Sequence, residues 1–397
     1  MHLPPHGHLT YCTNIHPGET WTEVKESLRH VLAVKEKLTG GKAFGIGLRL
    51  SAVAARQLSE PTALADFKHW LANHDCYVFT MNGFPYGGFH GEAVKDQVHT
   101  PDWSTRARVD YTKQLFDILA ELLPEGMDGG VSTSPLSYKP WLANLGGGAQ
   151  EQRTSQMDSH VLEVIDHLAA IYAHTGKDLH LDIEPEPDGL LENSTEFLDF
   201  YDRMLANGNE NQVRRHLAIC YDVCHFAVGY EAPADVLNKL QNAGIRIGRL
   251  QISAALKADL TDDRQAVHDS LLPYDEPTYL HQAALRRSDG SVDQFPDLAP
   301  ALEVMADPEY RELRTHFHVP IYADRYGVLE STNDAIRDSL RIWNAAPYTP
   351  HLEVETYTWD VLPDHQRLSL TDSIVRELQW VMDQLSKSAP NPRPKSA

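Results

Sequence analysis

The feature that most constrains the fold is a regular alternation of short apolar or β-branched runs with longer amphipathic helical patterns. Strands joined by helices of this length indicate parallel pairing, because a parallel return needs a long crossover connection. Eight such units predict an α/β fold, a (β/α)8 TIM barrel, and a doubly wound open sheet is the alternative. The expected strands are 9–14, 45–51, 77–83, 130–137, 179–187, 217–225, 246–253 and 351–359.

The pattern also sets the expected boundaries. Residues 1–385 are predicted to form one barrel domain, and the Pro- and Ser-rich tail 386–397 is expected to be disordered. The stretch 254–342 breaks the alternation, which predicts a loop-rich insertion after strand seven with one extra strand-like run, 315–322. After the first strand, Thr20 and a glutamate three residues later form a capping-box signature, so a helix is expected to begin there.

The composition disfavours several classes of binding partner and of protein. The chain has 35 Lys and Arg against 56 Asp and Glu, a formal net charge of −21, which disfavours nucleic acid or anionic lipid because phosphate groups need cationic surface. The 4 cysteines form no C-x-x-C pair, which disfavours a disulfide framework or a zinc finger. No apolar run approaches the ~18 residues of a membrane span, and the start lacks a secretory pattern. A cytoplasmic protein without a membrane span is therefore expected.

Parity along the strands points to chemistry inside the barrel. His180, Asp182 and Glu184 share one face of their strand, and Glu353 and Glu355 share one face of the last strand. The outer face of a barrel strand packs on helices and must be apolar, so these polar sets are expected to point inward. Buried carboxylates need a neutralising cation. The carboxyl ends of the strands, where barrel active sites lie, are thus predicted to hold a metal ion.

Two histidine-containing motifs could complete this site. Asp222 and His225 form a D-x-x-H at a strand end, where a carboxylate oxygen and an imidazole nitrogen could approach one ion, although such a pair can also be structural. His316 and His318 have equal parity, and both could reach a metal, or one could cap a loop. Oxygen-rich ligation with one or two histidines suits Mn, Mg, Fe or Zn, and Zn prefers more nitrogen.

Substrate-binding candidates lie around the same barrel end. Asn82 opens the loop NGFPYGGFHG, which includes His90, and the glycines of this loop allow close backbone approach to a ligand. The alternative is a loop held by aromatic packing. Arg49 and Lys139 lie at or just beyond strand ends, where each could meet a phosphate or carboxylate or could form a structural salt bridge.

Longer motifs carry a family resemblance across nearly the whole chain. They are LTYCTNIHPGETW, GIGLRLS, YVFTMNGFPYGGFHG, SYK, LDIEPEP, YDVCH, THFHVPI and LEVETYTWDVLP. With them the chain resembles the EboE family, the metabolite traffic proteins of bacterial ebo gene clusters, within the xylose-isomerase-like TIM-barrel superfamily. The resemblance implies a divalent metal ion on Glu184, Asp222, His225 and Glu355.

One position departs from the superfamily pattern. Gln251 stands on the seventh strand where a histidine is usual, which puts the metal and catalysis in question. His318, or alternatively His316 or His281 from the insertion, could supply the missing nitrogen; His281 is also a candidate to bind substrate.

Three functions follow from the residues and the resemblance together. The first is a metal-dependent isomerase or epimerase of a sugar- or cyclitol-like polyol, with Glu184 and Glu355 moving the proton. The second is metal-dependent phosphoester hydrolysis, with several ions held by further histidines such as His16 and His90. The third is a non-catalytic metabolite-binding protein for export of a secondary-metabolite precursor. Other ebo-cluster proteins, one of them a prenyltransferase-like membrane protein, are possible partners.

Overall fold

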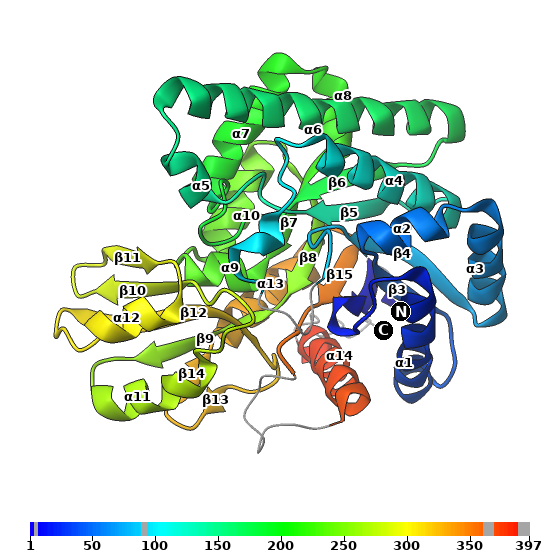
Figure 1. The fold of residues 1–397 in the computed structure, drawn as a ribbon. Coiled ribbons are helices and arrows are strands. Elements are labelled where there is room, and N and C mark those ends of the chain that lie inside the picture. Colours follow the sequence, from blue (N-terminus) through cyan, green and yellow to red (C-terminus); the bar gives the residue numbers. More distant parts are fainter. Residues whose placement is uncertain (4–6, 89–93, 360–368, 388–397) are drawn as a thin grey trace, which may run out of the picture.

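The computed structural model describes the chain except for residues 4–6, 89–93, 360–368 and 388–397 (Figure 1). Parallel strands form a barrel in the order β2-β15-β8-β7-β6-β5-β4-β3, and the short β1 (His2–Leu3) pairs antiparallel with β2. The eight predicted strands are all present, so the TIM-barrel prediction is confirmed. They are β2 (Gly7–Tyr11), β3 (Phe44–Arg49), β4 (Cys76–Asn82), β5 (Gly129–Thr133), β6 (Leu179–Ile183), β7 (Leu217–Asp222), β8 (Arg246–Ile252) and β15 (His351–Val354).

Side chains help to close the barrel between β2 and β3. The backbone contributes a parallel bridge between Cys12 and Gly47. Thr10 Oγ1 donates to Gly45 O at 2.8 Å and accepts from Gly47 N at 3.2 Å, so one hydroxyl spans the seam. A Cβ at Gly47 would lie 2.8 Å from the carboxyl carbon of Glu353, so glycine is needed there to make room for an inward carboxylate.

Helices cover the outside of the barrel. The first, α1 (Trp21–Thr39), begins after Thr20 with the predicted capping box to Glu23 and is capped by Gly40, whose φ of 61° is left-handed. The other covering helices are α2 (Ala52–Leu58), α3 (Pro61–Asn73), α4 (Arg106–Leu122), α5 (Lys139–Ala143), α6 (Gly147–Thr175), α7 (Ser194–Asn207), α8 (Glu210–His216), α9 (Val223–Val228), α10 (Pro233–Asn242), α13 (Asn333–Ala345) and α14 (Leu370–Lys387). Within the described ranges, no helix has the length and apolar character needed to cross a bilayer.

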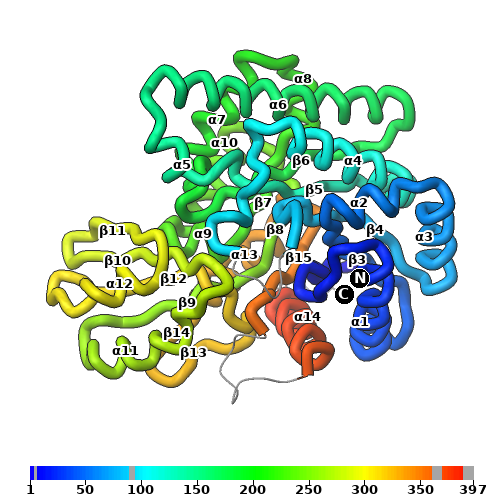
Figure 2. Tube along the Cα trace, in the orientation of Figure 1, coloured from blue at the N-terminus to red at the C-terminus, as the bar shows by residue number. Residues whose placement is uncertain are grey.

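The insertion after β8 lies where the sequence predicts it, but its loops join an antiparallel sheet of six strands in the order β11-β10-β12-β9-β14-β13. Figures 1 and 2 show it as a lobe on one side of the barrel, largely in yellow. The insertion is therefore more regular than the sequence predicts. Its strands were not expected because short strands broken by turns leave little periodic signal in a sequence. Its elements are β9 (Ala254–Asp259), α11 (Arg264–Leu271), β10 (Ala283–Arg287), β11 (Val292–Phe295), α12 (Leu298–Val304), β12 (Tyr310–Val319), β13 (Arg325–Tyr326) and β14 (Leu329–Ser331).

The predicted extra run 315–322 overlaps the second half of β12, which ends at Val319 and carries two histidines to the mouth of the barrel. At the carboxyl end, α14 continues to Lys387, two residues beyond the expected domain end. The rest of the predicted tail, 388–397, lies outside the described residues. The division into one domain and a tail stays a prediction.

Candidate metal centre

Three carboxylates meet at the carboxyl end of the barrel. Glu184 follows β6, Asp222 ends β7 and Glu355 follows β15, so parallel strands bring them to one edge. One oxygen of each lies within 4.8 Å of the other two, and all three residues are buried. Glu184 Oε2 and Asp222 Oδ2 have no hydrogen-bond partner in the part of the chain that the structure describes. Burial of bare carboxylate oxygens is costly unless a cation binds them.

Asp222 and His225 owe their positions to the start of α9. Asp222 caps this helix, because its Oδ1 accepts from His225 N at 3.1 Å and from Ser253 Oγ at 2.7 Å. The His225 Nδ1 lies 2.9 Å from Pro185 O and must donate to this carbonyl. The Nε2 lone pair of His225 is then available as a metal ligand, an orientation typical of metal-binding histidines.

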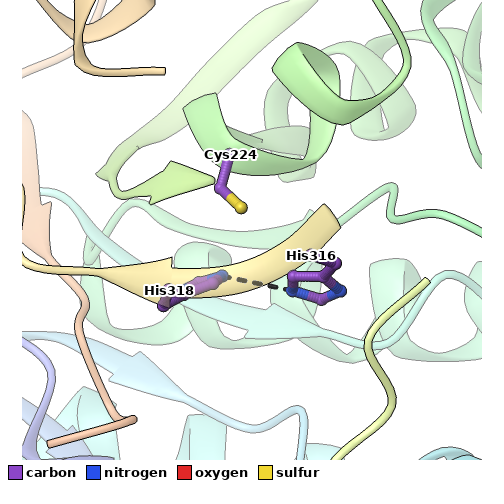
Figure 3. Close-up of side chains that lie close together, drawn as sticks. All are labelled: Cys224, His316 and His318. Atoms are coloured by element: carbon purple, nitrogen blue, oxygen red, sulfur yellow. Dashed lines mark hydrogen bonds between the residues drawn. The ribbon is translucent and has the colours of Figure 1, made fainter. Parts of the chain in front are cut away.

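The insertion brings two further imidazoles to the same place. His318 Nδ1 donates to the backbone oxygen of Glu355 at 3.0 Å, and His316 Nδ1 donates to Gln282 Oε1 at 2.9 Å. The Gln282 amide is fixed by its own donation to Pro187 O, so its oxygen must face His316. Both Nε2 atoms therefore carry lone pairs, and they face each other 3.2 Å apart (Figure 3). Two neutral rings in this arrangement repel unless a cation or proton lies between them.

Burial keeps these histidines uncharged. It lowers the pKa of His318 to about 4 and that of His316 well below the ordinary value, and the nearby His225 lowers the latter further. Neutral imidazoles are the form that binds metals. Three donor groups result, each with its atoms within 4.8 Å of one another. They are Asp222–His225–His318, Glu186–His225–His316 and Cys224–His316–His318.

Charge around the carboxylates favours a cation. Burial, followed by the nearby Asp222 and Glu353, raises the pKa of Glu355 to about 8. Burial also raises the pKa of Glu184 well above its usual value, and the charges of Glu355 and Asp222 add to the rise. The fully buried Arg249 is already paired, since its Nη1 donates to Glu353 Oε2 at 2.6 Å. The donor set fits a divalent ion, which would neutralise the excess negative charge.

The predicted ligand Gln251 lies on β8 between two acidic neighbours, in register with Asp222 of β7 and Glu353 of β15. It is buried with an inward amide. The donor groups draw their nitrogen from His225 of α9 and from the insertion histidines instead. The structure thus places His318 where it could supply the nitrogen that the seventh strand lacks.

A cavity of about 580 Å³, including its open mouth, leads to these ligands. Its walls come from the loop after β4, from the insertion and from the end of β15. They combine aromatic rings with hydrogen-bonding groups, among them Asn82, Phe84, Lys95, Tyr279, Gln282 and Tyr357. Such a mixed wall suits a small polar ligand with an apolar ring face.

Among the predicted substrate-binding residues, Asn82 lines the cavity and its Nδ2 donates to Glu355 Oε1 at 3.4 Å. His281 lies behind the wall, where its Nδ1 lies 3.1 Å from His316 O and its Nε2 lies 2.8 Å from Glu276 Oε1. It supports the strand that carries the insertion histidines. His90 lies outside the described residues.

The two predicted cationic residues form ion pairs away from the cavity lining. The Nη1 of the buried Arg49 contacts Glu19 Oε1 at 2.9 Å. Lys139 Nζ contacts Glu192 Oε2 at 2.6 Å and Glu196 Oε1 at 2.9 Å. For both residues, the structure matches the salt-bridge alternative.

Sequence reasoning missed Glu186 and Cys224 as potential ligands. Glu186 Oε1 lies 3.0 Å from His99 Nε2 and close to His225 and His316. Its signal was present, because Glu184 and Glu186 alternate with prolines in LDIEPEP and share parity. The approach of Cys224 to the insertion histidines depends on how the insertion folds back over α9 and had no local signal.

Comparisons with known proteins place the fold. No protein-family model matches the chain, and no curated protein matches its sequence. It is similar to a xylose isomerase-like TIM barrel protein from Mycobacterium smegmatis in complex with magnesium, with a TM-score of 0.50 and 11% identity over 97% of this chain and 98% of that one. The IOLI protein with a bound zinc atom follows at a TM-score of 0.49 and 12% identity, over 97% and 100% of the two chains. The fold is that of a xylose isomerase-like TIM barrel.

Proposed function

We propose that the protein is a divalent-metal-dependent isomerase or epimerase of a small sugar- or cyclitol-like polyol, serving an EboE-type role in metabolite traffic or biosynthesis. The observation that carries the proposal lies at the carboxyl end of the barrel, where potential metal ligands converge. Some of their oxygen atoms have no hydrogen-bond partner among the described residues. Bare oxygens of Glu184 and Asp222 meet there with Glu355, beside two facing imidazole nitrogens. The metal-bearing neighbours in the same fold agree with this chemistry.

In this proposal Glu184, Asp222, Glu355, His225 and His318 hold the ion. A bound divalent ion supplies Lewis-acid polarisation of a substrate carbonyl and the adjacent hydroxyl. The protein's own work is proton transfer: a carboxylate removes the proton from the carbon next to the carbonyl and returns it to the same or the adjacent carbon. Glu184 and Glu355 are the candidates, because both carboxylates line the cavity that a substrate would enter.

The cavity supports the substrate class. The side chains of Asn82 and Gln282 can hydrogen-bond hydroxyl groups. The rings of Phe84 and Tyr357 can pack on the C–H face of a cyclic polyol. We expect polyols to bind in the cavity, and simple aliphatic acids of equal size to bind there less tightly.

Deuterium incorporation tests the proposal. The Mn²⁺-loaded chain is incubated in deuterated water with a panel of ketoses, aldoses and inososes, and uptake at carbon is followed by NMR. We expect uptake on at least one compound, and a drop of 100-fold or more, about 3 kcal/mol, in Glu355→Gln. Lys139→Ala is the matched control and should keep the wild-type rate. No uptake across the panel from a folded, metal-loaded chain contradicts the proposal.

Phosphoester hydrolysis is the second candidate, favoured by the donor group Glu186–His225–His316 next to the carboxylates. Two-ion sites stabilise both the attacking and the leaving oxygen. It predicts two or more ions per chain and release of phosphate from small phosphoesters. One ion in the cavity together with deuterium uptake favours isomerisation.

A non-catalytic carrier for export is the third candidate, and Gln251 in place of a histidine favours it. Cells that carry Glu184→Gln and Glu355→Gln distinguish it. Full export of the metabolite in such cells would support a carrier, and loss of export with retained protein level would support catalysis.

A further inference from the structure

A second set of metal-ligating side chains lies at the opposite end of the barrel. Asp128 precedes β5, His180 begins β6 and His351 begins β15, so all three belong to the amino-terminal ends of the strands. One donor atom of each lies within 4.8 Å of the other two. Both histidines are fully buried, and Asp128 is partly exposed. The mechanism proposed above uses none of these residues.

The neighbours of His180 fix how its ring can bind. Its Nδ1 contacts Asp182 Oδ1, and because a carboxylate only accepts hydrogen bonds, Nδ1 carries the proton. Burial lowers the pKa of His180, which favours the neutral ring. The Nε2 then carries a lone pair, and this atom has no hydrogen-bond partner among the described residues. A carboxylate that orients an imidazole in this way is typical of metal sites.

The Nε2 of His180 faces negative charge. It lies 3.8 Å from Asp128 Oδ2, and His351 Nε2 lies 3.3 Å from Asp128 Oδ1. Burial acts to raise the pKa of Asp128, but His351, His180 and Arg246 outweigh it and hold the pKa well below its usual range. Asp128 Oδ2 already accepts from Arg246 Nη2 at 2.6 Å, so the atom that lacks a partner among the described residues is the Nε2 of His180, and a metal ion beside Asp128 would supply one. Ligands at about 2.0–2.2 Å from a tetrahedral ion are about 3.3–3.6 Å apart, close to the spacings seen here.

Two glycines, one on β5 and one on β8, leave space for the side chains of His180 and Asp182. A Cβ at Gly248 would lie 2.0 Å from Asp182 Oδ1 and 2.7 Å from His180 Nδ1. A Cβ at Gly130 would lie 2.4 Å from both Asp182 Oδ2 and His180 Cε1. Barrel interiors are usually filled by apolar side chains, so glycines on two strands that admit a His–Asp pair indicate a dedicated polar site.

We propose that Asp128, His180 and His351 form a second, structural metal site of zinc-type chemistry at the amino-terminal end of the barrel, with Asp182 as the positioning residue. Two imidazole nitrogens and one carboxylate are a set that suits Zn²⁺. The site joins β6 to β15, which are separated in the sheet by β7 and β8. The ion links these strands at the amino-terminal end of the barrel. Its removal lowers the stability of the chain and leaves the cavity at the other end unchanged.

Zinc stoichiometry tests the site. The full chain is dialysed against buffers with free Zn²⁺ held near 1 nM, in the affinity range of structural zinc sites, and bound zinc is counted. We expect Asp128→Asn and His180→Gln each to bind one ion fewer per chain than wild type. His216→Gln, which changes an equally buried imidazole outside the cluster, should bind as much as wild type. Equal zinc content in wild type and folded Asp128→Asn overturns the proposal.

Two further readouts keep the test independent of folding defects. Asp182→Asn should weaken zinc binding by about 10- to 100-fold, since it leaves every ligand in place but replaces the charged acceptor of the His180 Nδ1 proton with a neutral amide. Crystals grown in the same zinc buffer should show an anomalous zinc peak between His180 Nε2, His351 Nε2 and Asp128. Zinc peaks elsewhere with none at this position refute the site.

Discussion

Replacing Glu355 with glutamine separates the effect of the carboxylate cluster on folding stability from its role in metal binding. In the metal-free chain the pKa of Glu355 is raised from 4.5 to about 8, so the folded chain holds a proton that the unfolded chain releases. The sign follows from linkage: stability from this group is complete below pH 4.5 and is lost as the pH rises towards 8. Glutamine has the same shape, stays neutral and can still accept from Asn14 and Asn82.

The magnitude follows from the shift. At ~1.4 kcal/mol per pH unit, the wild-type chain loses up to about 3 kcal/mol between pH 4.5 and pH 7 from this group. An unfolding entropy of about 2.1 cal/mol/K per residue over 397 residues converts this into a rise of roughly 3–4 °C in the Tm of metal-free Glu355→Gln at pH 7. The gain should vanish near pH 4.5.

Bound metal is expected to make the wild-type chain more stable than Glu355→Gln, the reverse of the order in the metal-free chain. An ion at a thousand times its Kd stabilises the folded wild-type chain by about 4 kcal/mol, and a 100-fold weaker site gains only about 1.4 kcal/mol. The assay is differential scanning calorimetry from pH 4.5 to 8, with a chelator or with Mn²⁺. Glu163→Gln, a surface carboxylate paired with Arg106, is the control and should leave the Mn²⁺-induced shift unchanged. A stability difference that does not grow with pH, or an undiminished Mn²⁺ shift in Glu355→Gln, refutes the reasoning.

Three further changes test other parts of the molecule. Gly248→Ala places a Cβ 2.0 Å from Asp182 Oδ1, and calorimetry should show a loss of about 1–3 kcal/mol from overpacking. Burial raises the pKa of Glu377 to about 8, so its stability contribution is lost as the pH rises from 4.5 to 8, and Glu377→Gln should flatten the pH dependence by up to about 3 kcal/mol at pH 7. His318→Gln should weaken Mn²⁺ binding at least about 10-fold, and adding Gln251→His should restore part of it, measured by titration calorimetry.

The barrel could be predicted because its signal is local. Alternation identified the eight strands, and the capping box at Thr20 identified the start of α1. The expected strands mostly ran two to five residues too far at their carboxyl ends, because residues such as Glu184 continue the polar alternation after the sheet ladder stops. The antiparallel sheet of the insertion was not visible in the sequence, since β9 pairs with β12 and β14, which lie far along the chain.

The site shows the same division between local and distant information. Asp222 and His225 could be assigned together because they are three residues apart at one strand end. His281 was a candidate for substrate, yet it supports the strand that carries His316, and only the fold of the insertion reveals that role. Arg49 was a candidate either for a ligand anion or for a structural salt bridge, and its pairing with Glu19, just before the capping residue Thr20, matches the second alternative.

The position of Gln251 gains a physical meaning from this comparison. β8 carries Gln251, which brings no imidazole to the site, whereas the connection that follows this strand carries β12 back over the cavity. His318 is held by the Glu355 backbone oxygen with its Nε2 towards Asp222 and His225. An ion held in part by the insertion would couple metal binding to the position of the cavity wall, because both depend on the same strand.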